Sequence, residues 1–110
     1  MKVPDHIRGS IAPTFTAFNE DGSLDDAGQR NLMDFMEEQG GVYAYFIRAG
    51  MGQMYAFAPD DVKQLVTNVC AHMKGRKPIL VGCNCEWNRD YTKRPNPDTF
   101  IKPGVELCKF

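Results

Sequence analysis

The sequence predicts an α/β fold in which parallel strands alternate with helices. Three short apolar runs, at residues 9–18, 42–47 and 78–83, have the character of strands, and two segments with helical spacing separate them. This order is typical of right-handed β-α-β units on a parallel sheet. Each repeat takes about 35 residues, near the average of about 250 residues over eight units in a (β/α)8 TIM barrel. The pattern predicts either the first three units of such a barrel or an open, doubly wound sheet.

The first predicted strand, at residues 9–18, ends before the polar turn NEDG. Ser23 and Asp26 then have the spacing of a capping box, which predicts that a helix begins there. The Gly40-Gly41 pair predicts where this helix ends. The residues predicted to form its buried face recur at helical spacing: Leu24, Ala27, Gly28, Asn31, Leu32, Phe35 and Met36.

The most apolar stretch is VYAYFI at residues 42–47, and RAGMGQ follows it. Six consecutive apolar residues predict a strand that is covered on both faces. Gly50 and Gly52 then allow a sharp turn at the carboxyl end of this strand, the edge at which α/β folds hold their ligands. From these residues alone, the turn is either part of a binding site or a tight loop without a ligand.

A second helix is predicted to begin at Pro59 and to end at Lys74 and Gly75. Its apolar stripe, predicted to be buried, consists of Val62, Leu65, Val66, Val69, Cys70 and Met73. His72 lies beside this stripe, so we expect a solvated helix residue rather than a ligand or a catalytic base. The third strand, PILVGC, is predicted at residues 78–83.

A long polar segment, NCEWNRDYTKRPNPD at residues 84–98, follows the third strand. Trp87 and Tyr91 lie among its cations, but acidic residues nearly balance that charge, so the segment lacks the positive excess that nucleic-acid binding needs. In a barrel, a loop at this edge would form a wall or lid over the substrate. A third helix is predicted at residues 99–110. Its Pro103 and Gly104 are tolerated only near the first turn.

Composition disfavours several classes of partner. The 110 residues suit a single partial domain, residues 1–110, with 43% apolar residues and a net charge of −1. Such a charge gives no attraction to nucleic acid or to an anionic membrane, and no glycine-rich nucleotide-binding motif occurs. No apolar run approaches the roughly 20 residues of a membrane span, and the first residues lack the apolar core of a secretory signal. We expect a cytoplasmic chain that binds small molecules or protein.

The four cysteines, Cys70, Cys83, Cys85 and Cys108, are expected to be free thiols, because nothing marks the chain as secreted. One residue separates Cys83 from Cys85, which is shorter than the gap in common zinc sites, and no histidine lies near them. We therefore predict no bound metal and no cofactor.

Five segments in order carry a resemblance to a known enzyme family: GSIAPTFTAF, NEDGSLD, AYFIRAGMGQ, FAPDD and GRKPILVG. From Arg8 to Gly82, with a looser match over residues 99–110, the chain resembles the amino-terminal third of the dihydrodipicolinate synthase and N-acetylneuraminate lyase family. The resemblance implies a (β/α)8 barrel, usually a homotetramer. It also implies a lysine that forms a Schiff base with pyruvate or a related 2-keto acid for aldol condensation, cleavage or dehydration.

The resemblance further implies where the keto acid would bind. The family's Gly-Thr-Thr-Gly-Glu turn, whose threonines help to hold the keto-acid carboxylate, falls on residues 49–53, so both hydroxyl side chains are missing. Gly50 could still offer its backbone N–H to an anion, and Met51 would make the pocket more apolar, which suits an altered keto acid. Thr16 falls where the family has a threonine after the first strand. The implied substrate-binding residues are Thr16, Gly50, Met51 and Gly52, and residues 86–97 resemble an insertion.

The family's catalytic lysine and assisting tyrosine lie on later strands, so no catalytic residue is expected in this chain. A Schiff-base lysine must be desolvated, and none of the seven lysines lies within an apolar run. Three strands also cannot close a barrel, so we expect either a fragment of a longer protein or a chain that associates to cover its open edges. Two functions stay open: a portion of a Schiff-base lyase or aldolase, or a non-catalytic piece that acts by association or has no activity alone.

Overall fold

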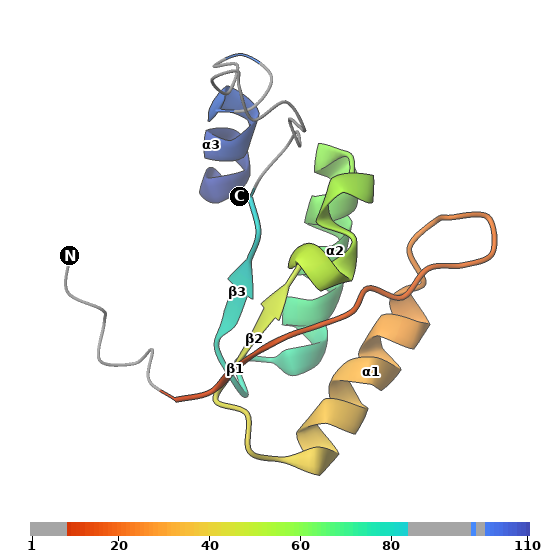
Figure 1. The fold of residues 1–110 in the computed structure, drawn as a ribbon, viewed down its shortest axis with the longest axis vertical. Coiled ribbons are helices and arrows are strands. Elements are labelled where there is room, and N and C mark those ends of the chain that lie inside the picture. The colour runs from red at the N-terminus through yellow and green to blue at the C-terminus, as the bar shows by residue number, and fades with distance from the viewer. Residues whose placement is uncertain (1–8, 84–97, 99–100) are drawn as a thin grey trace.

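The strands and helices alternate along the chain, and the three strands form one parallel sheet (Figure 1). The structure is a computed structural model, and it describes residues 9–83, 98 and 101–110. In chain order the elements are β1 (Ile11–Pro13), α1 (Asp26–Gln39), β2 (Ala44–Ile47), the 3-10 turns η1 (Gly50–Gly52) and η2 (Met54–Ala56), α2 (Pro59–Met73), β3 (Ile79–Val81) and α3 (Lys102–Lys109). The predicted order of parallel β-α units is confirmed.

β2 is the central strand of the sheet, between β1 and β3. Tyr45 pairs with Ala12 of β1 and with Ile79 of β3, and both pairings are parallel. Just beyond β1, the Thr14 N–H donates to the Phe46 carbonyl at 3.0 Å. Among the described residues β1 and β3 each pair on one side only, so the sheet is open at both edges.

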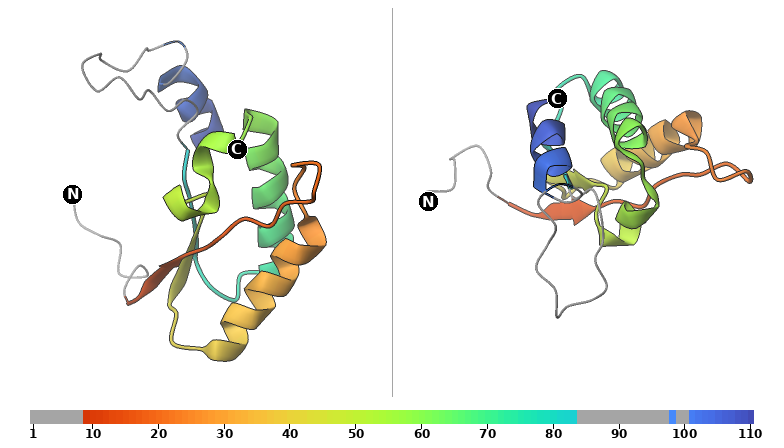
Figure 2. Two further views of the ribbon diagram at one scale, coloured as in Figure 1. Left: turned by 45° about the vertical axis from the view of Figure 1, so that its right-hand side comes forward. Right: turned by 90° about the horizontal axis from the view of Figure 1, so that it is seen from above.

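The hydrophobic core lies between the sheet and the two helices on one of its faces, α1 and α2 (Figure 2). Tyr45 and Ile47 share the helix-facing side of β2, because residues two apart on a strand point the same way. They belong to a buried cluster with Met33, Phe57, Val62, Leu65, Val69, Met73 and Leu107. Burying one large apolar side chain contributes about 1.5–3 kcal/mol, so this layer supplies much of the stability.

The predicted ends of α2 are confirmed. The helix begins at Pro59, and the side chain of Asp61 accepts a hydrogen bond from the Ala58 N–H at 2.8 Å. It ends at Met73, and the capping residue Lys74 has the left-handed φ of 49° typical of a helix terminus. The last helix is also confirmed, with Pro103 in its first turn.

α1 begins within the predicted stretch, but its predicted capping residue is wrong. Its predicted buried face is only partly confirmed, because Leu24 and Met36 pack against the core. Asp25 caps the helix by accepting a hydrogen bond from the Gly28 N–H at 2.8 Å, whereas Ser23 donates to Asp21. The buried residues of the helix are Gln29 and Met33.

The predicted face of α1 instead reaches solvent at Ala27, Asn31 and Phe35, and Phe35 is 57% exposed. Gln29 turns inward because its Oε1 accepts a hydrogen bond from the Ala17 N–H, at 2.9 Å, in the loop between β1 and α1. Hydrophobic spacing cannot show this, since it counts glutamine as a surface residue.

Three smaller expectations need correction. β1 is shorter than the predicted run at residues 9–18, because only residues 11–13 keep the register with β2. Cys70 is exposed rather than part of the core, because it lies on the side of α2 turned away from the sheet. His72 is half-buried rather than solvated, and its Nε2 lies 2.7 Å from Asp34 Oδ1 on α1.

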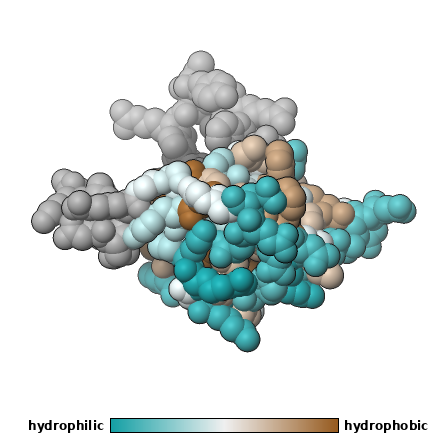
Figure 3. Space-filling model, turned by 90° about the horizontal axis from the view of Figure 1, so that it is seen from below, coloured by the Kyte–Doolittle hydropathy of each residue, from teal (hydrophilic) through white to brown (hydrophobic). Residues whose placement is uncertain are grey.

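Apolar side chains remain on the surface of the described part of the chain. The large ones include Ile11, Phe15, Phe35, Met51, Ile101, Val105 and Phe110. Seen from below, polar residues cover the nearest part of the molecule and apolar residues emerge beside them (Figure 3). No helix in the described ranges has the length and apolar character needed to cross a membrane.

Candidate functional site

The predicted substrate turn lies at the carboxyl edge of the sheet. Residues 49–53 follow the end of β2, and Thr16 follows the end of the neighbouring parallel strand β1. The chain leaves β1 and β2 at the same edge of the sheet (Figure 1). The carboxyl ends of parallel strands share one edge, where ligands bind in α/β folds. The four residues singled out from the sequence, Thr16, Gly50, Met51 and Gly52, are therefore brought to one place.

A direct hydrogen bond joins Thr16 to this turn. Its Oγ1 donates to the Gly52 carbonyl at 2.7 Å. Gly52 is buried, and a Cβ atom at this position would lie only 2.8 Å from the Thr14 carbonyl oxygen. Gly52 therefore lets the turn approach the backbone after β1, and Thr16 fixes that approach.

Gly50 and Met51 form the exposed part of the turn. Met51 is 45% exposed, and a Cβ at Gly50 would meet no atom within 4 Å. The left-handed backbone falls on Gln53, with a φ of 59°, and not on Gly50. Side chains can therefore be added at residue 50 without strain, and both residues present a surface that a ligand could reach.

Arg48 is a buried cation immediately before the turn. It is 1% exposed and has a left-handed φ of 51°. Its Nη1 donates to the Gly82 carbonyl at 2.5 Å, and the guanidinium carbon lies 5.7 Å from the centre of the Phe57 ring. Arg48 thus ties the end of β2 to the end of β3. In the sequence, Arg48 stands out as a charged residue between an apolar strand and a glycine-containing turn. Its burial and its contact with Gly82 were not predicted from the sequence.

A polar cluster occupies the opposite, amino edge of the sheet. Tyr45 donates a hydrogen bond to Glu37 at 2.5 Å, and Lys77 Nζ lies 3.0 Å from the same carboxylate oxygen. Burial raises the pKa of the Tyr45 hydroxyl above its usual range, and its hydrogen bond to Glu37 raises it further; this bond also lowers the pKa of Glu37. These contacts join the end of α1 to β2 and to the segment before β3.

The described residues of the candidate site include no lysine that could form a Schiff base. The lysines in the described ranges lie on helices, at helix ends or in loops, and none lies in a strand. In the same part of the chain, no three His, Cys, Asp or Glu side chains are close enough to hold a metal ion. Cys70 and Cys108 are free thiols.

The segment predicted to form a lid, residues 84–98, lies outside the described residues except for Asp98. Its aromatic residues Trp87 and Tyr91, and the thiol of Cys85, are therefore not placed relative to the turn. The same holds for Lys2 and Lys93.

The sequence model of the dihydrodipicolinate synthetase family matches residues 6–90. The chain is 31% identical over 80 residues to a probable 5-dehydro-4-deoxyglucarate dehydratase 2 from Streptomyces avermitilis, covering 73% of this chain and 24% of that protein. It is 34% identical over 76 residues to a 4-hydroxy-tetrahydrodipicolinate synthase from Dechloromonas aromatica, covering 69% and 26%. The chain thus spans about a quarter of the length of these curated relatives.

Solved structures share the arrangement of strands and helices. N-acetylneuraminate lyase from Mycoplasma synoviae superposes with a TM-score of 0.73 at 23% identity, covering 96% of this chain and 32% of that one. A prophage protein of the dihydrodipicolinic acid synthase family from E. coli K12, solved with pyruvate, gives a TM-score of 0.66 at 28% identity, covering 70% and 26%. The predicted fold class is confirmed: three parallel β-α units align to about a third of a TIM-barrel chain.

Proposed function

This chain belongs to the dihydrodipicolinate synthetase family, and on that basis we propose that it is the amino-terminal portion of a Schiff-base-forming lyase or aldolase. The substrate would be pyruvate or a related 2-keto acid, and the catalytic lysine would lie beyond residue 110. One observation carries the proposal: the matched segment, residues 6–90, contains β2 and the turn at the carboxyl edge. Because the relatives include a dehydratase and a synthase, condensation, cleavage and dehydration all remain candidate reactions.

The proposed substrate contacts follow from the geometry of the turn. The Gly50 N–H would meet the keto-acid carboxylate, and the exposed Met51 would contact its apolar part. Thr16 and Gly52 would position these groups, because the Thr16 hydroxyl is already bonded to the Gly52 carbonyl. The pyruvate held by the related E. coli protein supports a small keto acid as ligand.

Borohydride reduction in the presence of pyruvate tests this function. A complete protein that continues into the later strands should give a stable pyruvyl-lysine adduct, detected by intact mass spectrometry. Residues 1–110 alone should give none, since the described lysines lie outside the strands. An adduct on this chain above that of an unrelated control protein, or no adduct on the complete protein, would contradict the proposal.

The open sheet favours a second candidate, in which the chain acts only by association. β1 and β3 have unpaired edges within the described residues, and Ile11 is 41% exposed. The natural reading frame separates the two candidates. A continuation of about 180 residues with a lysine inside an apolar strand supports the enzyme, because eight β-α units need about 250 residues.

For the complete enzyme we also propose, by family resemblance, a cytoplasmic homotetramer.

A further inference from the structure

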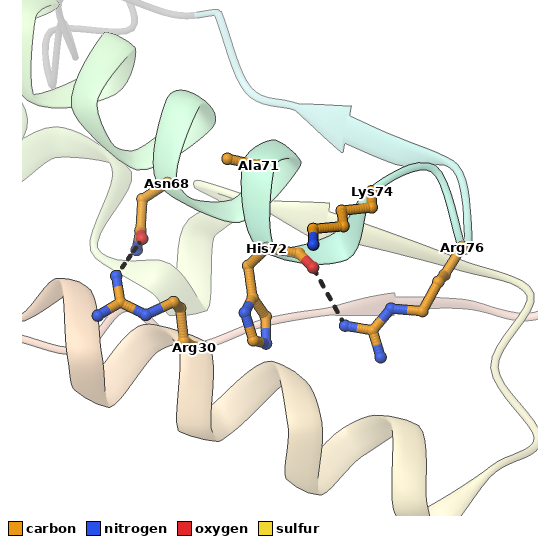
Figure 4. A pocket seen from close by; sticks show the side chains of 6 residues that line it. All are labelled: Arg30, Asn68, Ala71, His72, Lys74 and Arg76. Atoms are coloured by element: carbon orange, nitrogen blue, oxygen red, sulfur yellow. Dashed lines mark hydrogen bonds between the residues drawn. The ribbon is translucent and has the colours of Figure 1, made fainter.

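A groove lies between α1 and α2 on the solvent side of the helix layer (Figure 4). It has a volume of about 600 Å³ and is lined by Arg30, Asn68, Ala71, His72, Lys74 and Arg76. Most of these residues lie at or just beyond the carboxyl end of α2, shortly before β3 begins. The groove is therefore near the amino edge of the sheet, away from the substrate turn.

The lining is positively charged, although the whole chain has a net charge of −1. Arg30, Lys74 and Arg76 are cations at neutral pH, and no lining residue is acidic. One described carboxylate lies within ion-pair distance of the lining residues: Asp34 Oδ1 lies 2.7 Å from His72 Nε2 and 3.6 Å from Arg76 Nη2. Glu37 also acts on Arg76, but Lys77 pairs with Glu37, so the groove keeps an excess of positive charge.

Two of the three cations keep donors that no described residue uses. Arg30 donates one hydrogen bond to a neutral partner, from its Nη1 to Asn68 Oδ1 at 2.6 Å. In the described part of the chain, no carboxylate lies within ion-pair distance of Lys74. Arg76 differs, because it caps α2 by donating to the carbonyls of Met73 and His72.

The helix dipole explains only part of this charge. Lys74 and Arg76 lie at the carboxyl end of α2, where a cation is favourable. Arg30 lies in the amino-terminal half of α1, where the dipole does not favour a cation. Its guanidinium nevertheless points across the groove to α2 (Figure 4).

We propose that this groove binds an oxyanion of the phosphate type, with Arg30 and Lys74 as its direct ligands. A guanidinium matches two phosphate oxygens with parallel N–H donors, and an ammonium adds a point charge from the facing helix. A volume of about 600 Å³ leaves room for a pyrophosphate or a phosphate ester as well as for a single phosphate. The site is separate from the keto-acid turn, so it stands whether or not that turn binds substrate.

Titration of the 110-residue chain with inorganic pyrophosphate tests the site. Calorimetry at low ionic strength should show saturable binding with about one ligand per chain, and affinity should fall as sodium chloride is raised towards about 0.15 M. Amide chemical-shift changes should concentrate at Arg30 and residues 68–76. Vesicles that carry a phosphoinositide, compared with phosphatidylcholine vesicles, show whether the phosphate comes from a lipid headgroup or from a soluble compound.

Two conservative variants remove the charges without disturbing their surroundings. Arg30→Gln keeps an amide that can donate to Asn68, and Lys74→Asn suits the left-handed backbone at that position. Each variant should weaken pyrophosphate binding roughly 10-fold, because it replaces a charge-assisted hydrogen bond to the anion with a weaker neutral one. Lys109→Gln is the matched control, because it removes a cation on α3 that pairs with Glu106 outside the groove.

Circular dichroism melting confirms that each variant is folded before binding is compared. Equal affinity in Arg30→Gln, Lys74→Asn and the parent chain would overturn the proposal, as would the absence of saturable binding to pyrophosphate. An equal loss in Lys109→Gln would show that pyrophosphate senses only overall charge.

Discussion

Thr14 holds a buried hydroxyl that has no hydrogen-bond partner among the described residues. The residue is 1% exposed, and an unpaired buried polar group costs about 1–3 kcal/mol. Thr14→Val removes the hydroxyl and keeps the branched shape, so the free energy of unfolding should rise by about 1 kcal/mol.

Urea unfolding followed by circular dichroism measures this change, and Thr16→Val is the matched control. The Thr16 hydroxyl is bonded to the Gly52 carbonyl, so its removal should lower stability instead. If Thr14→Val also destabilises the chain, the Thr14 hydroxyl has a partner that the described residues do not include.

The two glycines of the turn at residues 49–53 should respond oppositely to alanine. Gly52→Ala places a Cβ 2.8 Å from the Thr14 carbonyl oxygen, so the backbone must shift and stability should fall by about 1–3 kcal/mol. Gly50→Ala meets open space and an ordinary φ, so it should be neutral or stabilise by about 0.4–1 kcal/mol. Denaturation midpoints of the two variants give the comparison directly, and similar losses for both would show that the turn has a different geometry.

Threonine at residues 50 and 51 should change substrate preference in the complete protein. Each hydroxyl that bonds a carboxylate contributes about 1.5–3 kcal/mol, so a pyruvate-like acid should bind roughly 10-fold more tightly. The open space at Gly50 and the exposure of Met51 remove the main steric objection. The adduct-forming affinity of Gly50→Thr, Met51→Thr and the double variant is measured over a panel of keto acids. Unchanged affinity in folded variants would remove this turn from the substrate site.

Among the elements, α2 and β2 could be predicted because local signals and packing agree. Pro59 and Lys74 mark the ends of α2, and the uninterrupted apolar run of β2 matches a strand buried between helices and neighbouring strands. The order of the elements followed from these signals.

The orientation of α1 could not be predicted, because a tertiary contact decides it. Gln29 lies on the buried side through its hydrogen bond to Ala17, 12 residues earlier in the chain, while Phe35 is left exposed. At the candidate site, too, the local feature could be predicted and the long-range contact could not. The spacing of the glycines located the turn, but Arg48 is held by the Gly82 carbonyl, 34 residues away in the chain.

The contacts that α1 makes with α2 and with β2 should weaken in acid. The His72 hydrogen bond lowers the pKa of Asp34, and the Tyr45 hydrogen bond lowers that of Glu37. A carboxyl group with a lowered folded pKa stabilises the fold above its unfolded pKa of about 4. It loses this contribution as the pH falls through the folded pKa. Asp34→Asn should therefore flatten the decline in unfolding free energy below about pH 4.

Asp60→Asn is the control for this pH dependence. The Asp60 side chain is 96% exposed and lies 3.7 Å from the ammonium of Lys63, so the decline should keep its shape. Urea denaturation at several pH values gives both profiles. A decline that is equally steep in Asp34→Asn and in the parent chain would show that the Asp34–His72 contact does not stabilise the fold.

At the scale of the whole molecule, Ile11→Lys should have different effects in the 110-residue chain, whose sheet is open, and in a complete barrel. Ile11 of β1 is 41% exposed, and neighbouring Ala12 packs on the core, so Ile11 belongs to the face of β1 turned away from the helices. In a closed barrel this face becomes the packed interior. Ile11→Lys should therefore reduce self-association of the 110-residue chain with little change in its stability, because an exposed apolar group promotes contact between copies.

In the complete protein the same lysine would be buried inside the barrel, where an unpaired charge costs several kcal/mol. Sedimentation velocity at increasing concentration measures association of the short chain, and denaturation measures the loss in the complete protein. Phe35→Lys is the control on the helix layer, because Phe35 is 57% exposed on α1 and a barrel interior would not cover it. If the complete protein tolerates lysine at residue 11 as well as at residue 35, the barrel does not close over β1, and association becomes the better account of this chain.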